Sequence, residues 1–474
     1  MSYVHTTIQA SRTIKERSDL QIPLRVMKSL AIPSGVSITV CFGAAQAQAS
    51  VSGVDHASCV TMCPSLVRTL HIPISTKFLM RYDSQQQTLY FGPFLGILLT
   101  SYQQGHPQEP FGHLSSFLNE MVDTFNQKGG FACVFSIDDV DWENKTVRAL
   151  IRQKGLWQNS PLPLPHSIYN RLSSRQREQS EKVVDFVGRC KLLEIPFFNE
   201  RFLNKWHVHK ALRNDETVSS YLPETMLFSQ NGELSTMLET HRILYAKPAN
   251  GSMGKGIFRV MKESNHYGVR YVSRQKVAAL KQKNLDSLQK FLKKRCKGKS
   301  YVLQQGLTLI GIGSNPTDFR VLVQKNRRGI WAATSIVART GQNSIVSNVA
   351  RGGSMMSAKQ ALQTCGPWKS NNKPTISTLR KVALLIAKRL EYSLQGEYAE
   401  FGIDLGIDVD GQIWLLEVNS KPSKGITSLQ VKENETAPRR PRPSVRRLVD
   451  YSAFLNGFDE PIRQTDTSHK KKKR

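Results

Sequence analysis

The sequence predicts a protein of mixed α/β and α+β class with a small β-rich module at its N-terminus. Three observations support this prediction. The chain has 474 residues, which at about 150 residues per domain suggests about three structural units. Short β-branched runs separated by turn residues fill residues 24–90, and strand-like and helix-like patterns alternate further on. Hydrophobic residues make up 39% of the chain, enough for ordinary buried cores.

Residues 1–88 contain the predicted β module, in which runs such as SITVCF, CVTM and TKFLMRYD are typical of strands. Residues 35–51 are apolar and end in small residues. They begin too far from Met1 for a signal peptide, and they are too short and too interrupted to span a bilayer. We therefore expect no transmembrane segment and a cytoplasmic location. No internal repeat is expected.

An α/β unit is predicted over residues 89–190. The strand-like run LYFGPFLGILLTS is followed by apolar residues at helical spacing and by a second strand, FACVFSI. Strand, helix and strand in this order are typical of an α/β domain. Residues 191–430 alternate further strands and helices, and the basic residues 431–474 are expected to form a flexible tail.

The net charge is strongly positive. Lys and Arg number 66 against 37 Asp and Glu, giving +29. Such an excess favours anionic partners without choosing among them. Basic residues concentrate in 274–299 and 470–474, where they form either a solvated helix face and a tail or a nucleic-acid-binding surface. No recognition motif with interleaved aromatic residues accompanies them, so nucleic acid is not expected as a partner.

The seven cysteines do not form a disulfide framework. His56, Cys59, Cys63 and His71 are residue types that bind zinc, but their spacing fits no common zinc module. We expect these residues to be buried or incidental rather than metal ligands.

A pair of carboxylates is predicted in residues 402–420, GIDLGIDVDGQIWLLEVNS. Asp410-Gly411 between two apolar runs predicts a two-residue hairpin turn. Counting outward from that turn places Asp404 directly opposite Glu417, with Asn419 on the same face. Such oxygen ligands suit Mg²⁺ or Mn²⁺. Without a cation, one carboxyl of the pair should have a raised pKa. The alternatives are an exposed hairpin with solvated carboxylates, or pairing with a basic side chain.

A glycine-rich loop is predicted in residues 243–260, ILYAKPANGSMGKGIFRV, between two strands. Its glycines let backbone amides approach phosphate oxygens closely, and its lysines add positive charge. It is not a Walker loop, because no Gly-Lys-Ser/Thr opens a helix. The alternative is a simple glycine-rich hairpin turn. The candidate residues are Lys247, Asn250, Gly251, Ser252, Gly254, Lys255 and Gly256.

These two segments, in this order, resemble those of ATP-grasp enzymes. The pattern E-V-N-S-x-P-x-x-G-I begins at Glu417, and Asn204-Lys205-Trp206 resembles the motif that carries the first nucleotide lysine. Residues 301–305 resemble the adenine hinge strand, and residues 318–320 resemble the D-x-R motif of glutathione synthetase-like members. Over residues 195–430 the chain resembles most the YheC/YheD family, the endospore coat-associated ATP-grasp proteins. The segments that carry this resemblance are FFNERFLNKWHVHKAL, YLPETMLF, KPANGSMGKGIFRV, DFRVLVQK, SNVARGG and GIDLGID…WLLEVNSKPSKGI.

The resemblance implies an ATP-grasp fold at residues 191–430, preceded by a pre-ATP-grasp α/β domain at 89–190. It implies an ATP-dependent ligase that joins a carboxylate to an amine or a thiol through an acyl phosphate. The implied partners are ATP, Mg²⁺ or Mn²⁺, an unknown carboxylate, an amine or peptide substrate, and spore-coat proteins, with the spore coat as a second location. An ATP-grasp kinase with a hydroxyl acceptor and a non-catalytic coat or scaffold protein are the alternatives.

The resemblance also assigns roles to single residues. His207 and His209, close to Lys205, are expected on a helix surface, and Gln304 and Gln305 stand where many ATP-grasp enzymes have Glu. The implied metal ligands are Asp404, Glu417 and Asn419. The implied triphosphate ligands are Lys205, Lys247 and the 250–256 loop, and the adenine contacts are Gln304, Gln305, Gly306 and Leu307. The residues implied to face the phosphoryl group or acceptor are Arg320, Arg339, Asn348, Arg351 and Lys421.

Overall fold

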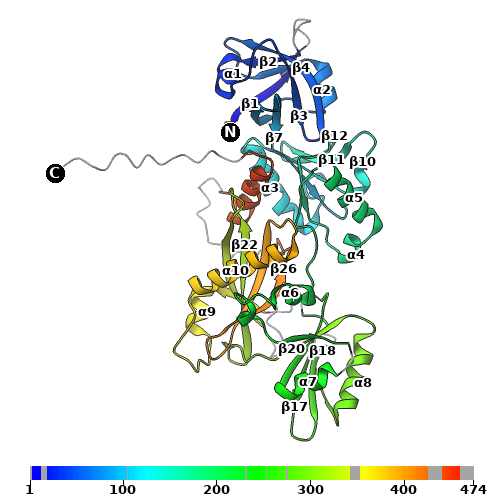
Figure 1. Cartoon of the computed structure of the whole chain (residues 1–474), viewed down its shortest axis with the longest axis vertical. Helices are drawn as coiled ribbons and strands as arrows, with labels where there is room; N and C mark the ends of the chain where they lie inside the picture. The colour runs from blue at the N-terminus through cyan, green and yellow to red at the C-terminus, as the bar shows by residue number, and fades with distance from the viewer. Residues whose placement is uncertain are drawn as a thin grey trace, which may run out of the picture. The chain divides into compact units, whose positions relative to one another are not determined.

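A computed structural model describes residues 3–11, 19–103, 105–229, 232–251, 254–273, 276–341, 353–424 and 440–458. The chain divides into two compact units, whose elements can be followed in Figure 1. The first unit comprises the residues up to Phe198, the segment Lys325–Ile330 and the residues from Arg440 onward. The second comprises Asn199–Gln324 and Trp331–Arg439. Each unit buries hydrophobic cores of its own.

The first unit begins with a closed β-barrel, in which closure leaves no strand edge unpaired. The predicted β runs form its strands, and residues 35–51 supply most of one hairpin rather than a membrane span. The strands are β1 (Tyr3–Ala10), β2 (Leu20–Pro23), β3 (Ser37–Phe42), β4 (Ala45–Val54), β5 (Val60–Met62), β6 (Lys77–Asp83) and β7 (Thr88–Gly92), in the order β1-β5-β2-β4-β3-β7-β6.

The barrel contains two similar segments of strand, helix and hairpin, a partial repeat that the sequence analysis did not identify. Its helices α1 (Leu24–Leu30) and α2 (Pro64–Leu70) each have seven residues and each follow a short strand. Both end on a left-handed residue, Ala31 or His71, and both continue with Ile-Pro into an antiparallel hairpin. Apart from Leu-x-Ile-Pro at the end of each helix, the two segments share few residues, which is why their similarity is clearer in the structure than in the sequence.

The second part of the first unit is a mixed sheet in the order β10-β11-β9-β8-β13-β14, with β12 paired to β11. The predicted helix and second strand are confirmed as α3 and β9. The strands are β8 (Phe94–Leu98), β9 (Phe131–Phe135), β10 (Val140–Asp141), β11 (Thr146–Gln153), β12 (Leu156–Pro163), β13 (Ser167–Asn170) and β14 (Phe197–Phe198). The helices are α3 (Ser115–Gln127), α4 (Arg175–Glu178) and α5 (Glu181–Leu192).

Part of the expected tail is a helix, α11 (Pro443–Leu455), which belongs to the first unit. Proline at its first turn suits a helix N-terminus. Its apolar face is buried, and its polar residues pair with α3 through Arg442–Glu120 and Lys128–Asp450. The description of residues 431–474 as a flexible tail is therefore wrong for 443–455. The reason is that this stretch carries an amphipathic pattern which the surrounding Pro and Arg residues obscure.

The second unit contains two sheets, the first in the order β15-β20-β16-β17-β18-β19. Helices α7 (Glu233–Thr240) and α8 (Leu285–Cys296) contribute to one core with this sheet. Asn284 caps α8 by accepting from the backbone N–H of Ser287. The strands are β15 (Thr225–Leu227), β16 (Ile243–Pro248), β17 (Phe258–Lys262), β18 (Tyr267–Ser273), β19 (Lys276–Gln282) and β20 (Tyr301–Gln305).

The other sheet of this unit runs in the order β24-β23-β22-β25-β26, with β21 paired to β22. The apolar stripe of α10, whose residues recur at helical spacing, is buried in the core of this sheet. The strands are β21 (Gly311–Ile312), β22 (Asn315–Lys325), β23 (Trp331–Thr340), β24 (Ser354–Ser357), β25 (Glu400–Ile407) and β26 (Ile413–Asn419). The helices are α6 (Lys205–Leu212), α9 (Ala358–Thr364) and α10 (Ile376–Leu394).

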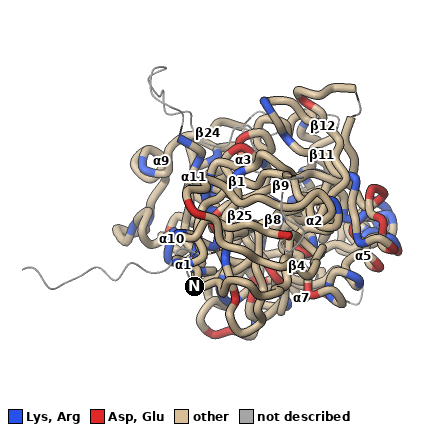
Figure 2. The backbone as a smooth tube through the Cα atoms, turned by 90° about the horizontal axis from the view of Figure 1, so that it is seen from above, with Lys and Arg blue, Asp and Glu red and all other residues tan. Residues whose placement is uncertain are grey.

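The positive charge is unevenly distributed. Around α5, Figure 2 shows basic and acidic residues interspersed, and Arg189 pairs with Asp185 one helical turn away. The first sheet of the second unit carries no Asp or Glu in any of its six strands. Among the described helices, none is long and apolar enough to cross a membrane.

The turn of the β25–β26 hairpin provides a stability prediction. Gly411 has a φ of +88°, and a Cβ added there would lie 2.4 Å from the carbonyl oxygen of Asn372. Gly411→Ala should therefore lower the free energy of unfolding by about 2 kcal/mol or more, because left-handed strain and a backbone clash add. Chemical denaturation measures the change. The control is Gly313→Ala, which has a φ of +59° and nothing within 4 Å. Equal losses in the two variants would contradict the role of the clash.

Candidate active site

The β25–β26 hairpin brings Asp404 and Glu417 directly opposite each other, as predicted. The predicted two-residue turn is wrong, because the strands separate at Ile407 and Ile413 and residues 408–412 form the loop. The longer loop shifts the strand register by one residue, and a β-bulge between Asp404 and Leu405 reverses this shift. The extra residue of the bulge restores the register that a two-residue turn would have produced.

Asp404 is buried and is held by two arginines. Arg320 lies opposite it on β22 and donates from both Nε and Nη2, the latter over 2.8 Å to Oδ2. Arg339 on β23 lies 2.9 Å from the same Oδ2 and donates over 2.6 Å to Asp318 on β22. Two carboxylates and two guanidinium groups therefore alternate in one charge-assisted network.

The expectation of a raised pKa in a cation-free carboxylate pair is wrong for Asp404. Burial alone would raise its pKa, but the charges and hydrogen bonds of Arg320 and Arg339 outweigh burial and lower it. The pKa of Arg339 is raised: burial opposes this shift, but Asp404 and Asp318 together prevail. Basic side chains therefore compensate Asp404, which was the alternative left open by the sequence.

Glu417 is paired with Lys205 at the start of α6. The Lys205 ammonium lies 3.2 Å from Glu417 Oε1 and donates over 2.8 Å to the carbonyl oxygen of Gly251. Asn204 caps this helix by accepting from the N–H of His207 at 2.8 Å. One lysine therefore joins the carboxylate hairpin to the glycine-rich loop.

Lys247 on β16 lies near this pair and donates over 2.5 Å to Gln304 Oε1 on β20. Gln304 in turn donates over 3.0 Å to the hydroxyl of Thr225. Burial lowers the pKa of Lys247 to about 8, and the charge of Lys205 acts in the same direction while Glu417 opposes it. A lysine ammonium is a compact point charge whose pKa shifts readily on burial.

A cavity of about 30 Å³ lies between the two sheets of the second unit, beside these groups. That volume has room for a few water molecules. His209 lines the cavity one helical turn from Lys205 and stacks on Trp206, instead of lying on an open helix surface. Burial and then the charge of Arg213 lower the pKa of His209. The i, i+4 spacing of His209 from Lys205 could have placed both side chains on one face of the helix.

The residues that line this cavity are Leu203, Lys205, Val208, His209, Leu222, Pro223, Thr225, Gln304, Leu415, Leu416, Glu417 and Val418.

The remaining predicted residues fall into three groups. Gly254 and Gly256 have positive φ in the loop between β16 and β17, beside Asn250, Gly251 and Lys255. Gln305 binds the backbone of Glu224 rather than facing the cavity, and Gly306 and Leu307 follow it directly. Asn419 pairs with Gly402 across the hairpin, and Lys421 lies over the ring of Phe202. Ser252, Asn348 and Arg351 lie outside the described residues.

The donor set suits a hard divalent cation. Asp404, Glu417 and Asn419 present two carboxylates and an amide oxygen at the end of one hairpin, which is the ligand chemistry of Mg²⁺ or Mn²⁺. In this structure Arg320, Arg339 and Lys205 balance the two carboxylates. Among the described residues, no group of three or more His, Cys, Asp and Glu is placed to hold a metal ion, either here or in the segment with Cys59 and Cys63.

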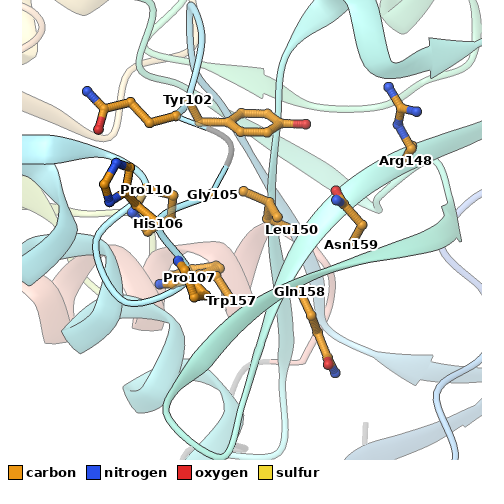
Figure 3. Close-up of a pocket in the computed structure, with 11 residues that line it drawn as sticks. Tyr102, Gly105, His106, Pro107, Pro110, Arg148, Leu150, Trp157, Gln158 and Asn159 are labelled. Carbon is orange, nitrogen blue, oxygen red and sulfur yellow. The ribbon is translucent and has the colours of Figure 1, made fainter.

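A second cavity, of about 320 Å³, lies in the first unit (Figure 3). Tyr102 and Trp157 contribute aromatic rings to it, and Arg148 and Asn159 project from the β11–β12 hairpin. Trp157 is fixed by a 2.8 Å hydrogen bond to Asn119 and by Phe111. The cavity contains none of the residues predicted for the site.

These features define an ATP-grasp protein. Two sheets of one unit present lysines and a glycine-rich loop on one side and paired carboxylates on the other. A family model described as YheC/D like ATP-grasp matches residues 194–455, more than half of the chain. The chain belongs to this YheC/D-like ATP-grasp family.

The chain is also similar to individual proteins. Endospore coat-associated protein YheD of Bacillus subtilis (strain 168) is 29% identical over 344 residues, covering 72% of this chain and 75% of YheD. Endospore coat-associated protein YheC of the same organism is 25% identical over 281 residues, covering 56% of this chain and 73% of YheC. Among solved structures, D-alanyl-alanine synthetase A from Vibrio cholerae has a TM-score of 0.45 and 11% identity, with 77% of this chain and 99% of that chain covered.

The buried network predicts a specific pH dependence. Asp404 has a folded-state pKa below its ordinary value, so its contribution to stability is complete above the unfolded pKa of about 3.9 and is lost as pH falls through the folded value. Asp404→Asn leaves Arg320 and Arg339 without this partner and should cost about 3–5 kcal/mol at pH 7. Its stability should also fall less than that of the wild type between pH 5 and pH 3. Urea unfolding in EDTA measures both effects, and a variant as stable as the wild type at pH 7 would contradict the network.

Proposed function

We propose that this protein is a Mg-ATP-dependent ligase that activates a carboxylate as an acyl phosphate and transfers the acyl group to an amine or a thiol. The observation that carries the proposal is the arrangement of Lys205, Lys247 and Glu417. Two lysines approach one carboxylate beside a glycine-rich loop, and Asp404 lies directly opposite that carboxylate. Clustered cations at a glycine-rich backbone suit a polyphosphate.

Each group has a part in binding the nucleotide. Lys205, Lys247 and the 250–256 loop would hold the triphosphate, since Lys205 already contacts the loop at the carbonyl oxygen of Gly251. Gln304, at the cavity wall, would contact the adenine through its side chain, with Gln305, Gly306 and Leu307 continuing the hinge. Asp404, Glu417 and Asn419 would hold the cation. A bound Mg²⁺ supplies charge neutralisation of the phosphates and orients the transferring group.

The reaction needs positioning more than proton transfer. A carboxylate oxygen of the substrate forms a bond to the γ-phosphorus as the bond to the β-phosphate oxygen breaks, releasing ADP. The amine then adds to the acyl carbon, phosphate leaves and the amine loses a proton. Arg320 and Arg339 lie at Asp404, where they would contact the transferring phosphoryl group, with Asn348, Arg351 and Lys421 as further candidates. Fixed cations stabilise the charge that develops in such transfers.

Spore-coat association is part of the proposal. Both curated relatives are named endospore coat-associated proteins, and the net charge of +29 suits assembly with anionic partners. Co-fractionation with coat extracts would test this separately from catalysis.

The lowered pKa of Lys247 leads to a prediction of how nucleotide binding depends on pH. Its pKa of about 8 means that it is charged below pH 8 and neutral above it. Phosphate binding requires the charged form, so affinity for ATP should weaken by about tenfold for each pH unit above 8. Calorimetry at pH 7, 8 and 9 measures this. Lys247→Met should bind ATP weakly at every pH while keeping the melting temperature of the unliganded protein. A variant that unfolds instead would show that Lys247 is structural.

Glu417 tests the ligase proposal as a whole. Mg-ATP should stabilise the wild type by about 2.7 kcal/mol at a hundredfold excess over Kd. Glu417→Gln should reduce this stabilisation and abolish Mg-dependent ADP release, because one of the two opposed carboxylates is lost. Glu216→Gln, on the exposed surface near α6, is the matched control.

The product distinguishes the reaction classes. Amide or thioester formation supports the ligase, whereas a phosphoester identifies a kinase. ATP binding with no turnover across amino-acid and peptide acceptors would favour a non-catalytic coat protein. No thermal shift with millimolar Mg-ATP would exclude the nucleotide site itself.

A further inference from the structure

The first sheet of the second unit has two different faces. One face is covered, since Leu244, Val260 and Val269 share a buried core with side chains of α7 and α8. Residues at alternate positions point to the other face. Lys247 and Gln304 of the nucleotide site lie on this second face.

A row of directly opposed residues crosses this second face, away from the nucleotide site. Gln304 pairs with Tyr245, Tyr245 with Arg259, and Arg259 with Arg270. Lys281 lies on the next strand, opposite Gly268 and on the same face as Arg270. Arg259 is half-buried and hydrogen-bonded to Tyr245, whereas Arg270 and Lys281 are exposed. The face therefore extends beyond the nucleotide residues as a set of three cations.

This set lacks acidic partners. None of the six strands contains Asp or Glu, and within the described part of the chain neither Arg259 nor Arg270 forms an ion pair with a carboxylate. Opposed side chains on neighbouring strands have Cβ atoms about 4.5–5.5 Å apart, where like charges destabilise the sheet. An anion placed between the two guanidinium groups would reverse that repulsion.

We infer that Arg259, Arg270 and Lys281 form a binding surface for an acidic peptide segment of the acceptor. The planar guanidinium fork matches a carboxylate with two parallel hydrogen bonds. An extended peptide presents alternate side chains on one side at about 6.6–7 Å, so successive carboxylates can reach cations on neighbouring strands.

Single-stranded nucleic acid fits this face less well. Proteins that bind it combine cations with exposed aromatic side chains on which bases stack. The aromatic residue in this row is Tyr245, which is half-buried and engaged by Arg259. The acceptor role of the peptide rests on the proposed function, but its binding can be measured without any turnover.

The test uses a hexaglutamate peptide and the full-length chain. Arg270→Gln combined with Lys281→Gln removes two exposed cations without touching Lys205, Lys247 or Gln304. The matched control, Lys290→Gln combined with Lys293→Gln, removes two exposed cations from α8 on the covered side of the same sheet. Calorimetry at low salt gives Kd for hexaglutamate, for ATP and for an oligothymidylate.

The expected result is a loss of hexaglutamate affinity of about tenfold or more in the first variant, with unchanged ATP affinity and little change in the control. Equal losses of hexaglutamate affinity in both variants would show that the peptide responds only to overall positive charge, and would overturn the inference. A parallel loss of ATP affinity would assign these residues to the nucleotide site. Tighter binding of the oligothymidylate than of hexaglutamate would identify a nucleic-acid surface instead. Absence of ATP binding in the wild type would count against the proposed function alone.

Discussion

The buried charge of Asp404 constrains most of the β24-β23-β22-β25-β26 sheet of the second unit. A buried carboxylate is costly unless it is paired and hydrogen-bonded, and here the compensation comes from Arg320 on β22 and Arg339 on β23. Glu417 must then lie opposite on β26 and find its own cation in Lys205. Side chains from four strands and one helix therefore meet in the charge network around a single hairpin.

The pairing of Asp404 with Glu417 was predictable because hairpin register is a local property. An Asp-Gly turn and two apolar runs place each residue by counting, and the helices with clear apolar spacing, such as α3 and α10, follow from the same kind of local pattern. The counting succeeded although the loop is longer than two residues. The bulge at Leu405 absorbs the difference before the strand reaches Asp404. The longer loop and the bulge therefore cancel, so that Asp404 still lies opposite Glu417.

The features that sequence reasoning missed depend on contacts between distant segments. Nothing in residues 402–420 shows that Arg320 and Arg339 compensate Asp404, so the direction of its pKa shift came out reversed. The seven-residue helices of the barrel repeat share too little sequence to be recognised, and the helix α11 becomes evident through its packing on α3. His209 was assigned to a surface because the cavity beside it is formed by strands far away in the chain.

Lys205 links the nucleotide side of the site to the carboxylate side. Its ammonium contacts the Gly251 carbonyl and Glu417, and its charge helps to lower the pKa of Lys247. A polyphosphate at the loop would offer Lys205 a stronger partner than a carbonyl oxygen, drawing charge compensation away from Glu417. A divalent cation at Glu417 and Asp404 would replace that compensation and would release Lys205 toward the phosphates. Under the proposed function, each ligand would relieve the electrostatic cost of the other, and by thermodynamic linkage each would favour the binding of the other equally.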